Sequence, residues 1–245
     1  MNLLKTARLI LFKVFKNKFV RGTLGFFFLV VIVFFLRSDF SKVEKFKCFT
    51  QYGPTCDTKD MATLEKVIGS NFFALDTKNL DSELSANFLN QETFIQKIIP
   101  QKLSVFIIKR KPAVGAKIVD KETPGYFLVD KDGVVVGFSQ NTSLPVLNYN
   151  SGEHNLVVGK TADDSFKEAI KLLNSLAYNF NIQVGSLEGS TLNALLPENI
   201  KVVYPLNKDT SVLSGSLQLI LARSKMEGNL PRVIDLRYKN PVLTY

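Results

Sequence analysis

The sequence is poor in the residues that most often carry catalysis and metal binding. It has one histidine, His154, and two cysteines, Cys48 and Cys56, among its 245 residues. His154 lies in a polar stretch, where we expect it to be solvated, so no Ser-His-Asp set is supported. A zinc site needs about four ligands, and these three residues do not supply them. We therefore predict no metal, no cofactor and no small-molecule substrate.

Motifs that bind phosphates or activate a serine are also missing. There is no phosphate-binding loop, and the stretch 185–189 (GSLEG) has the wrong spacing for the nucleophile elbow of a hydrolase. Asp130 and Asp132 flank a predicted hairpin turn, and turn chemistry explains both. The lack of candidate catalytic residues favours a binding or scaffold protein over an enzyme, with a membrane-tethered hydrolase as the alternative.

Acidic residues are absent before Asp39, and most of the net charge is concentrated in this N-terminal stretch. Residues 1–40 hold seven basic residues against one acid, so +6 of the net +9 lies there. A nucleic-acid-binding protein would carry its basic stripe on the folded part, so we expect no nucleic-acid partner. The natural partner of the basic tail is the anionic cytoplasmic face of a lipid bilayer.

An uncharged run of fifteen residues, 22–36 (GTLGFFFLVVIVFFL), lies between Arg21 and Arg37. As a helix it would be about 22 Å long, short for a hydrocarbon core of about 30 Å, but both arginines can extend its reach. We predict a transmembrane helix over 22–40, with the basic tail 1–21 in the cytoplasm. A cleaved signal peptide and a buried core helix are the alternatives, and an interfacial helix fits only residues 3–19.

Cys48 and Cys56 form a close pair around a turn-rich interior, Tyr52-Gly53-Pro54. An even pair of this kind suits a disulfide outside the cytoplasm. Closing so small a loop would contribute roughly 2–3 kcal/mol in the chain-entropy model. The alternative is two reduced thiols.

The rest of the chain predicts an α+β fold in two parts. Over 41–112, hydrophobic periodicity and capping residues indicate the order strand, helix, helix, strand, strand. Over 113–245, the pattern is richer in strands. It includes a hairpin around Asp132-Gly133 and helices over 164–180 and 211–226, and its last strand is expected at 232–238.

Five motifs occur in order along the chain: 71–76 (NFFALD), 98–105 with 109–114 (IIPQKLSV, KRKPAV), 127–135 (FLVDKDGVV), 144–147 (LPVL) and 233–238 (VIDLRY). Together they resemble the bacterial cell-division proteins FtsQ and DivIB over nearly the whole chain. The resemblance implies one transmembrane helix, a POTRA domain (β-α-α-β-β) at 41–112 and a C-terminal β-rich domain with flanking helices at 113–245. The sequence differs from the family pattern at Pro241, where a small residue is common.

The resemblance also implies a function. It predicts a non-enzymatic, single-pass plasma-membrane scaffold whose domains outside the cytoplasm bind FtsB/DivIC-like and FtsL-like proteins during septum assembly. A POTRA-bearing adaptor for protein export or envelope assembly is the alternative. If the last strand lies at a sheet edge, a partner can add a strand there. Carried over from the family, the partner-binding residues are Leu236, Arg237, Tyr238, Lys239 and Asn240.

Overall fold

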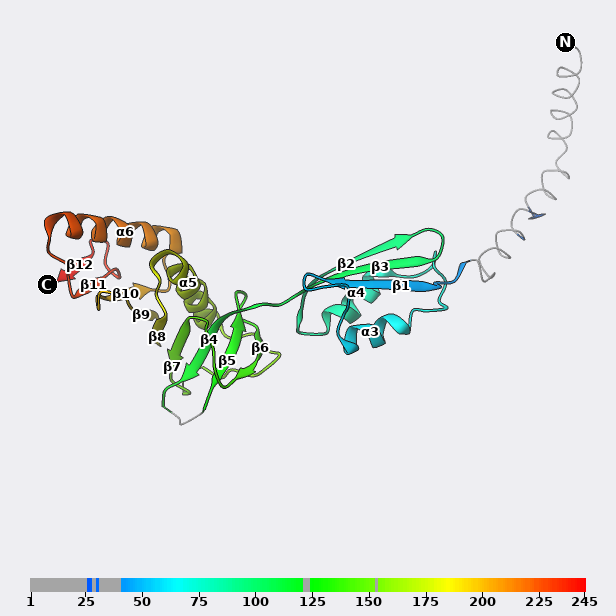
Figure 1. Cartoon of the computed structure of the whole chain (residues 1–245), viewed down its shortest axis with the longest axis horizontal. Helices are drawn as coiled ribbons and strands as arrows, with labels where there is room; N and C mark the ends of the chain where they lie inside the picture. The colour runs from blue at the N-terminus through cyan, green and yellow to red at the C-terminus, as the bar shows by residue number, and fades with distance from the viewer. Residues whose placement is uncertain (1–25, 28–29, 31–40, 121–123, 153) are drawn as a thin grey trace, which may run out of the picture. The chain divides into compact units, whose positions relative to one another are not determined.

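The computed structural model describes residues 26–27, 30, 41–120, 124–152 and 154–245 (Figure 1). The chain divides into two compact units between Lys109 and Arg110. The predicted boundary lay three residues later, after Pro112. Pro112 instead opens the first strand of the second unit.

The first unit is a three-stranded sheet with two short helices. Its elements are β1 (Lys45–Thr50), α3 (Thr58–Glu65), α4 (Thr77–Ser85), β2 (Asn90–Ile98) and β3 (Lys102–Lys109). The strand order is β1-β3-β2, with β1 parallel and β2 antiparallel to the central β3. Alternate residues of β3 are buried, and they meet apolar residues of both helices in one core. This unit therefore has the predicted β-α-α-β-β order.

A disulfide and a helix cap fix two parts of the first unit. Cys48 of β1 forms a disulfide with Cys56, with 5.8 Å between the two Cα atoms, and this ties the sheet to the loop before α3. The carboxylate of Asp76 accepts hydrogen bonds from the backbone N–H groups of Lys78 and Asn79, at 2.9 and 3.3 Å. These bonds satisfy donors that a helix start leaves open, so α4 begins directly after Asp76.

The second unit is built on a nine-stranded sheet, ordered β12-β11-β10-β9-β8-β7-β4-β5-β6. Three neighbouring pairs, β4 with β7, β7 with β8 and β10 with β11, are parallel, and the others are antiparallel. The strands are β4 (Pro112–Ile118), β5 (Tyr126–Asp130), β6 (Val135–Ser139), β7 (Val146–Tyr149), β8 (Val184–Glu188), β9 (Thr191–Leu195), β10 (Lys201–Pro205), β11 (Val233–Asp235) and β12 (Val242–Thr244).

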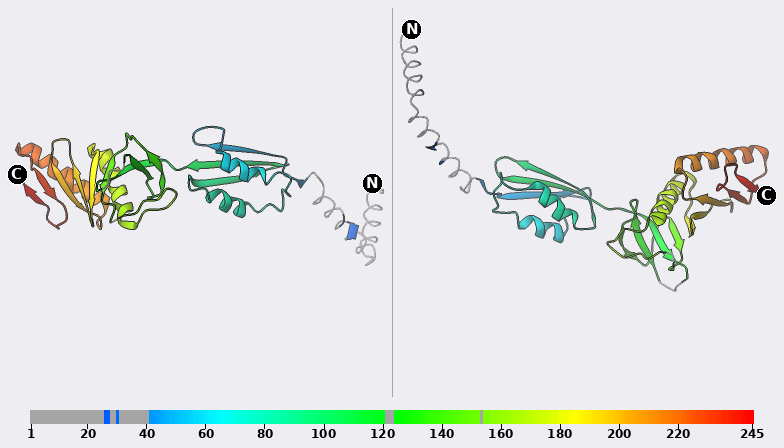
Figure 2. Two further views of the ribbon diagram at one scale, coloured as in Figure 1. Left: turned by 90° about the horizontal axis from the view of Figure 1, so that it is seen from below. Right: turned by 180° about the vertical axis from the view of Figure 1, so that it is seen from behind.

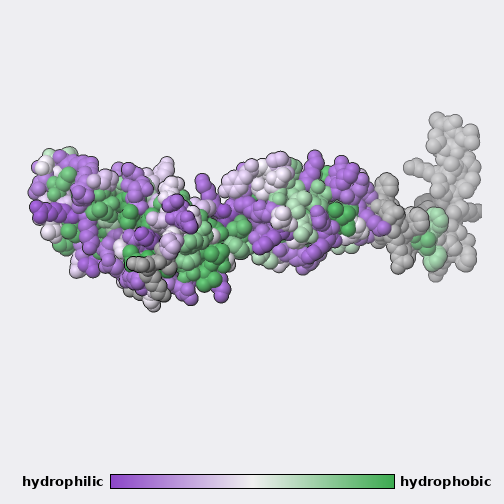
Figure 3. All heavy atoms as spheres, turned by 60° about the horizontal axis from the view of Figure 1, so that its bottom comes forward, coloured by the Kyte–Doolittle hydropathy of each residue, from purple (hydrophilic) through white to green (hydrophobic). Residues whose placement is uncertain are grey.

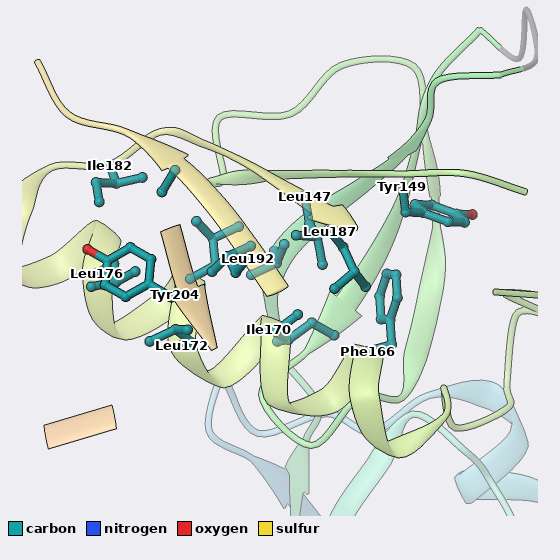
Figure 4. Close-up of a cluster of buried hydrophobic side chains, with 14 of the residues drawn as sticks. Leu147, Tyr149, Phe166, Ile170, Leu172, Leu176, Ile182, Leu187, Leu192 and Tyr204 are labelled. Carbon is teal, nitrogen blue, oxygen red and sulfur yellow. The ribbon is translucent and has the colours of Figure 1, made fainter. Parts of the chain in front are cut away.

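Two helices complete this unit, α5 (Asp164–Phe180) and α6 (Thr210–Glu227). α5 contacts α6 and the strands β4, β8 and β9, and it lies along one face of the sheet (Figure 2). Its buried residues include Phe166, Ile170 and Leu176, which point toward Leu147 and Leu192 of the strands (Figure 4). The predicted helix over 164–180 is present with the same bounds, and its apolar side chains face the core.

The predicted fold class needs correction in its membrane part. Among residues 26–27, 30, 41–120, 124–152 and 154–245, no helix combines the length and the apolarity needed to cross a bilayer. The predicted span at 22–40 lies outside the described residues, apart from Phe26, Phe27 and Val30, and the basic tail 1–21 lies wholly outside them. What the structure shows is a mixed α+β fold with one large sheet.

Candidate functional site

The five residues predicted to bind a partner follow β11 directly. Leu236 is only 2% exposed, and its backbone N–H donates to the carbonyl of Val203 at 2.9 Å. Its side chain belongs to the core and offers almost no surface to a partner. Arg237, Tyr238, Lys239 and Asn240 are exposed in the bend between β11 and β12. A partner at this place would meet these four residues.

Lys208 holds this bend from a distant part of the chain. Its ammonium group donates to three successive backbone carbonyls, those of Leu236 (3.0 Å), Arg237 (2.9 Å) and Tyr238 (3.1 Å). Lys208 lies between β10 and α6, so no local sequence signal points to this contact. A contact of this kind depends on the tertiary fold and cannot be found from the sequence pattern. Three charge-assisted hydrogen bonds fix the backbone path of the bend.

Arg237 and Asp235 form a second brace. The guanidinium group donates from Nε to Oδ1 at 3.0 Å and from Nη2 to Oδ2 at 2.6 Å. Hydrogen bonding to Arg237, with its charge and that of Lys208, holds the pKa of Asp235 below its usual value, against a smaller effect of burial. The guanidinium carbon also lies 5.8 Å from the centre of the Tyr238 ring. Arg237 thus orders the bend, and Tyr238, 56% exposed, is its most prominent apolar side chain.

The strand that carries the predicted site, β11, does not lie at the sheet edge. β11 pairs with β10 on one side and with β12 on the other, so it is an interior strand. The strand at this edge of the sheet is β12, which follows Pro241 and lies beyond the last strand expected from the sequence. β11 also ends at Asp235, short of the predicted residue 238. The outer side of β12 has no neighbouring strand in the described sheet, and Val242 and Tyr245 are each about half exposed beside it.

His154 is the clearest error among the predicted environments. Its side chain is buried rather than solvated, packed against the rings of Tyr149 and Phe166. Its Nδ1 lies 2.6 Å from Oδ2 of Asp163, the residue that caps α5. Burial alone would raise the pKa of Asp163, but hydrogen bonds from Ser165, the Phe166 backbone and His154 outweigh it and lower the pKa to about 2.

This cluster does not have the geometry of a nucleophilic relay. The hydroxyl of Ser165 donates to Asp163 at 2.6 Å, and His154 Nε2 has no hydrogen-bond partner among the described residues. A serine activated by histidine would instead hydrogen-bond to the imidazole. Within the described ranges there is also no group of three or more His, Cys, Asp or Glu residues that could hold a metal ion.

The best-defined candidate site is therefore the braced bend at 236–240 with the open edge of β12. Comparison of the chain with models of known protein families and with curated proteins finds no match.

Proposed function

We propose that this chain is a non-enzymatic scaffold of the FtsQ/DivIB kind. In this proposal its two folded units act outside the cytoplasm, at the plasma membrane, and bind FtsB/DivIC-like and FtsL-like proteins during septum assembly. The observation that carries the proposal is the open edge of β12 beside a rigid, exposed bend. The family named in the proposal comes from the five motifs, whose order along the sequence resembles that in FtsQ and DivIB.

An edge strand binds a partner by extending the sheet. Its unpaired N–H and C=O groups accept an added strand, and neighbouring side chains select which strand is accepted. Here Tyr238, Val242 and Tyr245 supply exposed apolar surface around the edge. Pro241 has no N–H, and the carbonyl of Thr244 faces β11, where it accepts the N–H of Arg232 at 2.7 Å. The outward N–H of the edge is therefore that of Leu243. A bend already fixed by Lys208 loses little conformational entropy when a partner binds.

The disulfide supports a location outside the cytoplasm. Cys48 and Cys56 are bonded in the first unit. Such bonds persist in oxidising compartments and are rare in the cytosol.

The test is a titration of the purified chain with the extracytoplasmic part of an FtsB-like protein. Tyr238→Ala removes the exposed ring, and Lys239→Glu reverses a neighbouring charge. Each should weaken binding by about tenfold, the loss of a side chain worth more than 1 kcal/mol at an interface. Tyr178→Ala, on α5, is the matched control because Tyr178 is 92% exposed and remote in sequence.

Equal affinities of the wild type, Tyr238→Ala and Lys239→Glu would refute the site at the strand edge. A fluorescent fusion tests the cellular role separately. Accumulation at the septum supports the division scaffold, whereas uniform labelling of the cell outline would favour an adaptor for export.

A further inference from the structure

One end of the first unit is assembled from three separate segments, 41–44, 66–73 and 97–102. The backbone N–H of Val43 donates to the carbonyl of Ser70 at 2.9 Å, and that of Gly69 donates back to the carbonyl of Val43 at the same distance. The N–H of Glu44 donates to the carbonyl of Gln101, in the turn between β2 and β3, at 3.0 Å. The start of β1, the stretch after α3 and the β2–β3 hairpin tip therefore lie together.

This end exposes large apolar side chains. Ile99, at the hairpin tip, is 77% exposed, and Ile68, Phe73 and Ile98 are each 43–49% exposed. Single exposed apolar residues are ordinary, but these four come from segments that hydrogen bonds hold together at one end of the unit. Hydrophobic and hydrophilic residues are interspersed at this end of the unit in Figure 3.

The same end carries an excess of positive charge. Its three segments and their neighbours contribute five lysines and two glutamates: Lys42, Lys45, Lys66, Lys97 and Lys102, with Glu44 and Glu65. Lys45 and Glu44 form an ion pair at 3.4 Å. Lys97 donates to the carbonyl of Leu75 at 2.8 Å and so holds the segment that carries Phe73. Lys42, Lys66 and Lys102 are exposed.

We propose that this end of the first unit docks on the surface of an anionic lipid bilayer. Apolar side chains that enter the boundary of the acyl chains, combined with lysines at headgroup level, are typical of interfacial binding. The apolar groups here come from a hairpin tip and a loop, which can insert shallowly while the sheet stays outside. The proposal concerns surface contact alone and does not rest on the partner-binding role proposed above.

The position in the chain selects lipid over an acidic protein. The uncharged run 22–36 ends at Leu36, and the buried Ser41 follows five residues later. Five residues reach at most about 17 Å, so this end of the unit cannot lie further than that from the run. A partner within this reach of so apolar a run is best matched by a surface with an apolar boundary beside anionic groups, and we therefore commit to a bilayer surface.

The experiment places a polarity-sensitive fluorophore on the full chain at Ile99→Cys. The two native cysteines are joined in the disulfide, so labelling is directed to the new thiol. With vesicles of about one-third anionic lipid, we expect emission to shift to the blue and to be quenched by nitroxide-bearing headgroups. A label at Glu92→Cys is the matched control. The label at this position should show neither the blue shift nor the quenching, because Glu92 lies seven residues before Ile99, about 23 Å away along the strand.

A charge-reversed variant tests the lysines. The variant Lys66→Glu/Lys102→Glu removes two lysines from this end of the unit. Each lysine removed should weaken binding of this end to the vesicles by about fivefold, so the blue shift of the label at Ile99 should be largely lost. Flotation with the vesicles shows separately whether the chain remains bound elsewhere. The control, Lys59→Glu/Lys131→Glu, changes net charge equally at two other exposed lysines and should keep the shift.

Docking on anionic lipid is supported if the blue shift is lost in Lys66→Glu/Lys102→Glu and kept in the control variant. Three results would overturn it: no shift at Ile99 on any vesicle, an equal shift at Glu92, or an equal shift on neutral vesicles. The first would leave an acidic protein as the partner of this end. Each outcome is independent of binding at β12, because the label and the substitutions all lie outside the second unit except the control Lys131.

Discussion

The buried ion pair of the first unit supports the sharpest prediction, because one lysine joins three elements there. The ammonium group of Lys109, at the end of β3, lies 2.5 Å from Asp60 of α3 and 2.7 Å from the side-chain oxygen of Asn90 in β2. It also contacts the half-exposed Asp57 at 2.6 Å. Asp60 is 1% exposed and accepts further hydrogen bonds from Asn87 and Asn90, each at 3.0 Å.

Lys109→Met keeps the apolar stem and removes the charge. It leaves the Asp60 carboxylate buried with two amide donors and no cation. Removing one partner of a buried pair typically costs 3–5 kcal/mol, because the remaining charge is uncompensated. Domains are usually stable by only 5–15 kcal/mol in total, so the first unit should lose a large part of its stability.

Two variants separate this effect from lost packing. Asp60→Asn added to Lys109→Met removes the stranded charge, and we expect it to recover about 2 kcal/mol, within the usual range of coupling between contacting residues. Asp57→Asn should cost less than about 1 kcal/mol, because half of that side chain is in water.

The chain has no tryptophan, so the assay is urea unfolding read by hydrogen exchange of peptides from β3, with peptides from α5 as the internal reference. The pH dependence gives an independent reading. Burial alone would raise the pKa of Asp60, but hydrogen bonds from Lys109, Asn87 and Asn90 hold it below its usual 3.8. A lowered folded pKa stabilises above about pH 4, and that stability is lost as the pH falls through the folded value. In Lys109→Met burial dominates and raises the folded pKa of Asp60, so protonation should relieve the cost of the mutation and the stability deficit relative to the wild type should shrink as the pH falls. A stability within 1 kcal/mol of the wild type would refute the reasoning.

Three further predictions concern single contacts. Lys208→Met should speed hydrogen exchange in the 236–240 bend and cost about 1–2 kcal/mol, since three carbonyls lose a charged donor. Asp163→Asn should remove part of the loss of stability that the second unit shows between about pH 4 and pH 2. The effect should be no more than about 1 kcal/mol, because the Asp163 side chain is half exposed. The control Asp164→Asn, whose side chain is 98% exposed, should leave this pH dependence unchanged. Reduction of Cys48–Cys56 should destabilise the first unit by roughly 2–3 kcal/mol, measured by the same exchange assay, and leave the second unit unchanged.

Local sequence signals predicted the elements of the first unit well. Asp76 marked the start of α4 because its carboxylate satisfies the open donors of the first turn. In the second unit, Gly228 ended α6 because it adopts the left-handed conformation there, at φ 68°. Signals of this kind act within a few residues, and a single sequence contains them in full.

Contacts between distant residues were not predictable in the same way. β12 has only three residues, preceded by a proline, and it forms a strand because β11 lies beside it. His154 is buried because Tyr149 and Phe166 enclose it, although its sequence neighbours are polar. The candidate site depends on both kinds of information. A motif points to its residues, whereas the edge depends on strand pairing and the brace depends on a side-chain contact from Lys208 to a distant bend.

The boundary between the units shows how adjacent residues can serve different folds. Lys109 is bonded to Asp60 in the first unit. Its neighbour Arg110 lies 2.6 Å from Asp130 in the second, and that buried carboxylate also accepts the N–H of Val134 at 2.7 Å. Turn chemistry therefore explains only part of the role of Asp130, because its carboxylate also binds a guanidinium group. Each of these two basic side chains therefore pairs within its own unit, and the division between the units falls at the peptide bond that joins them.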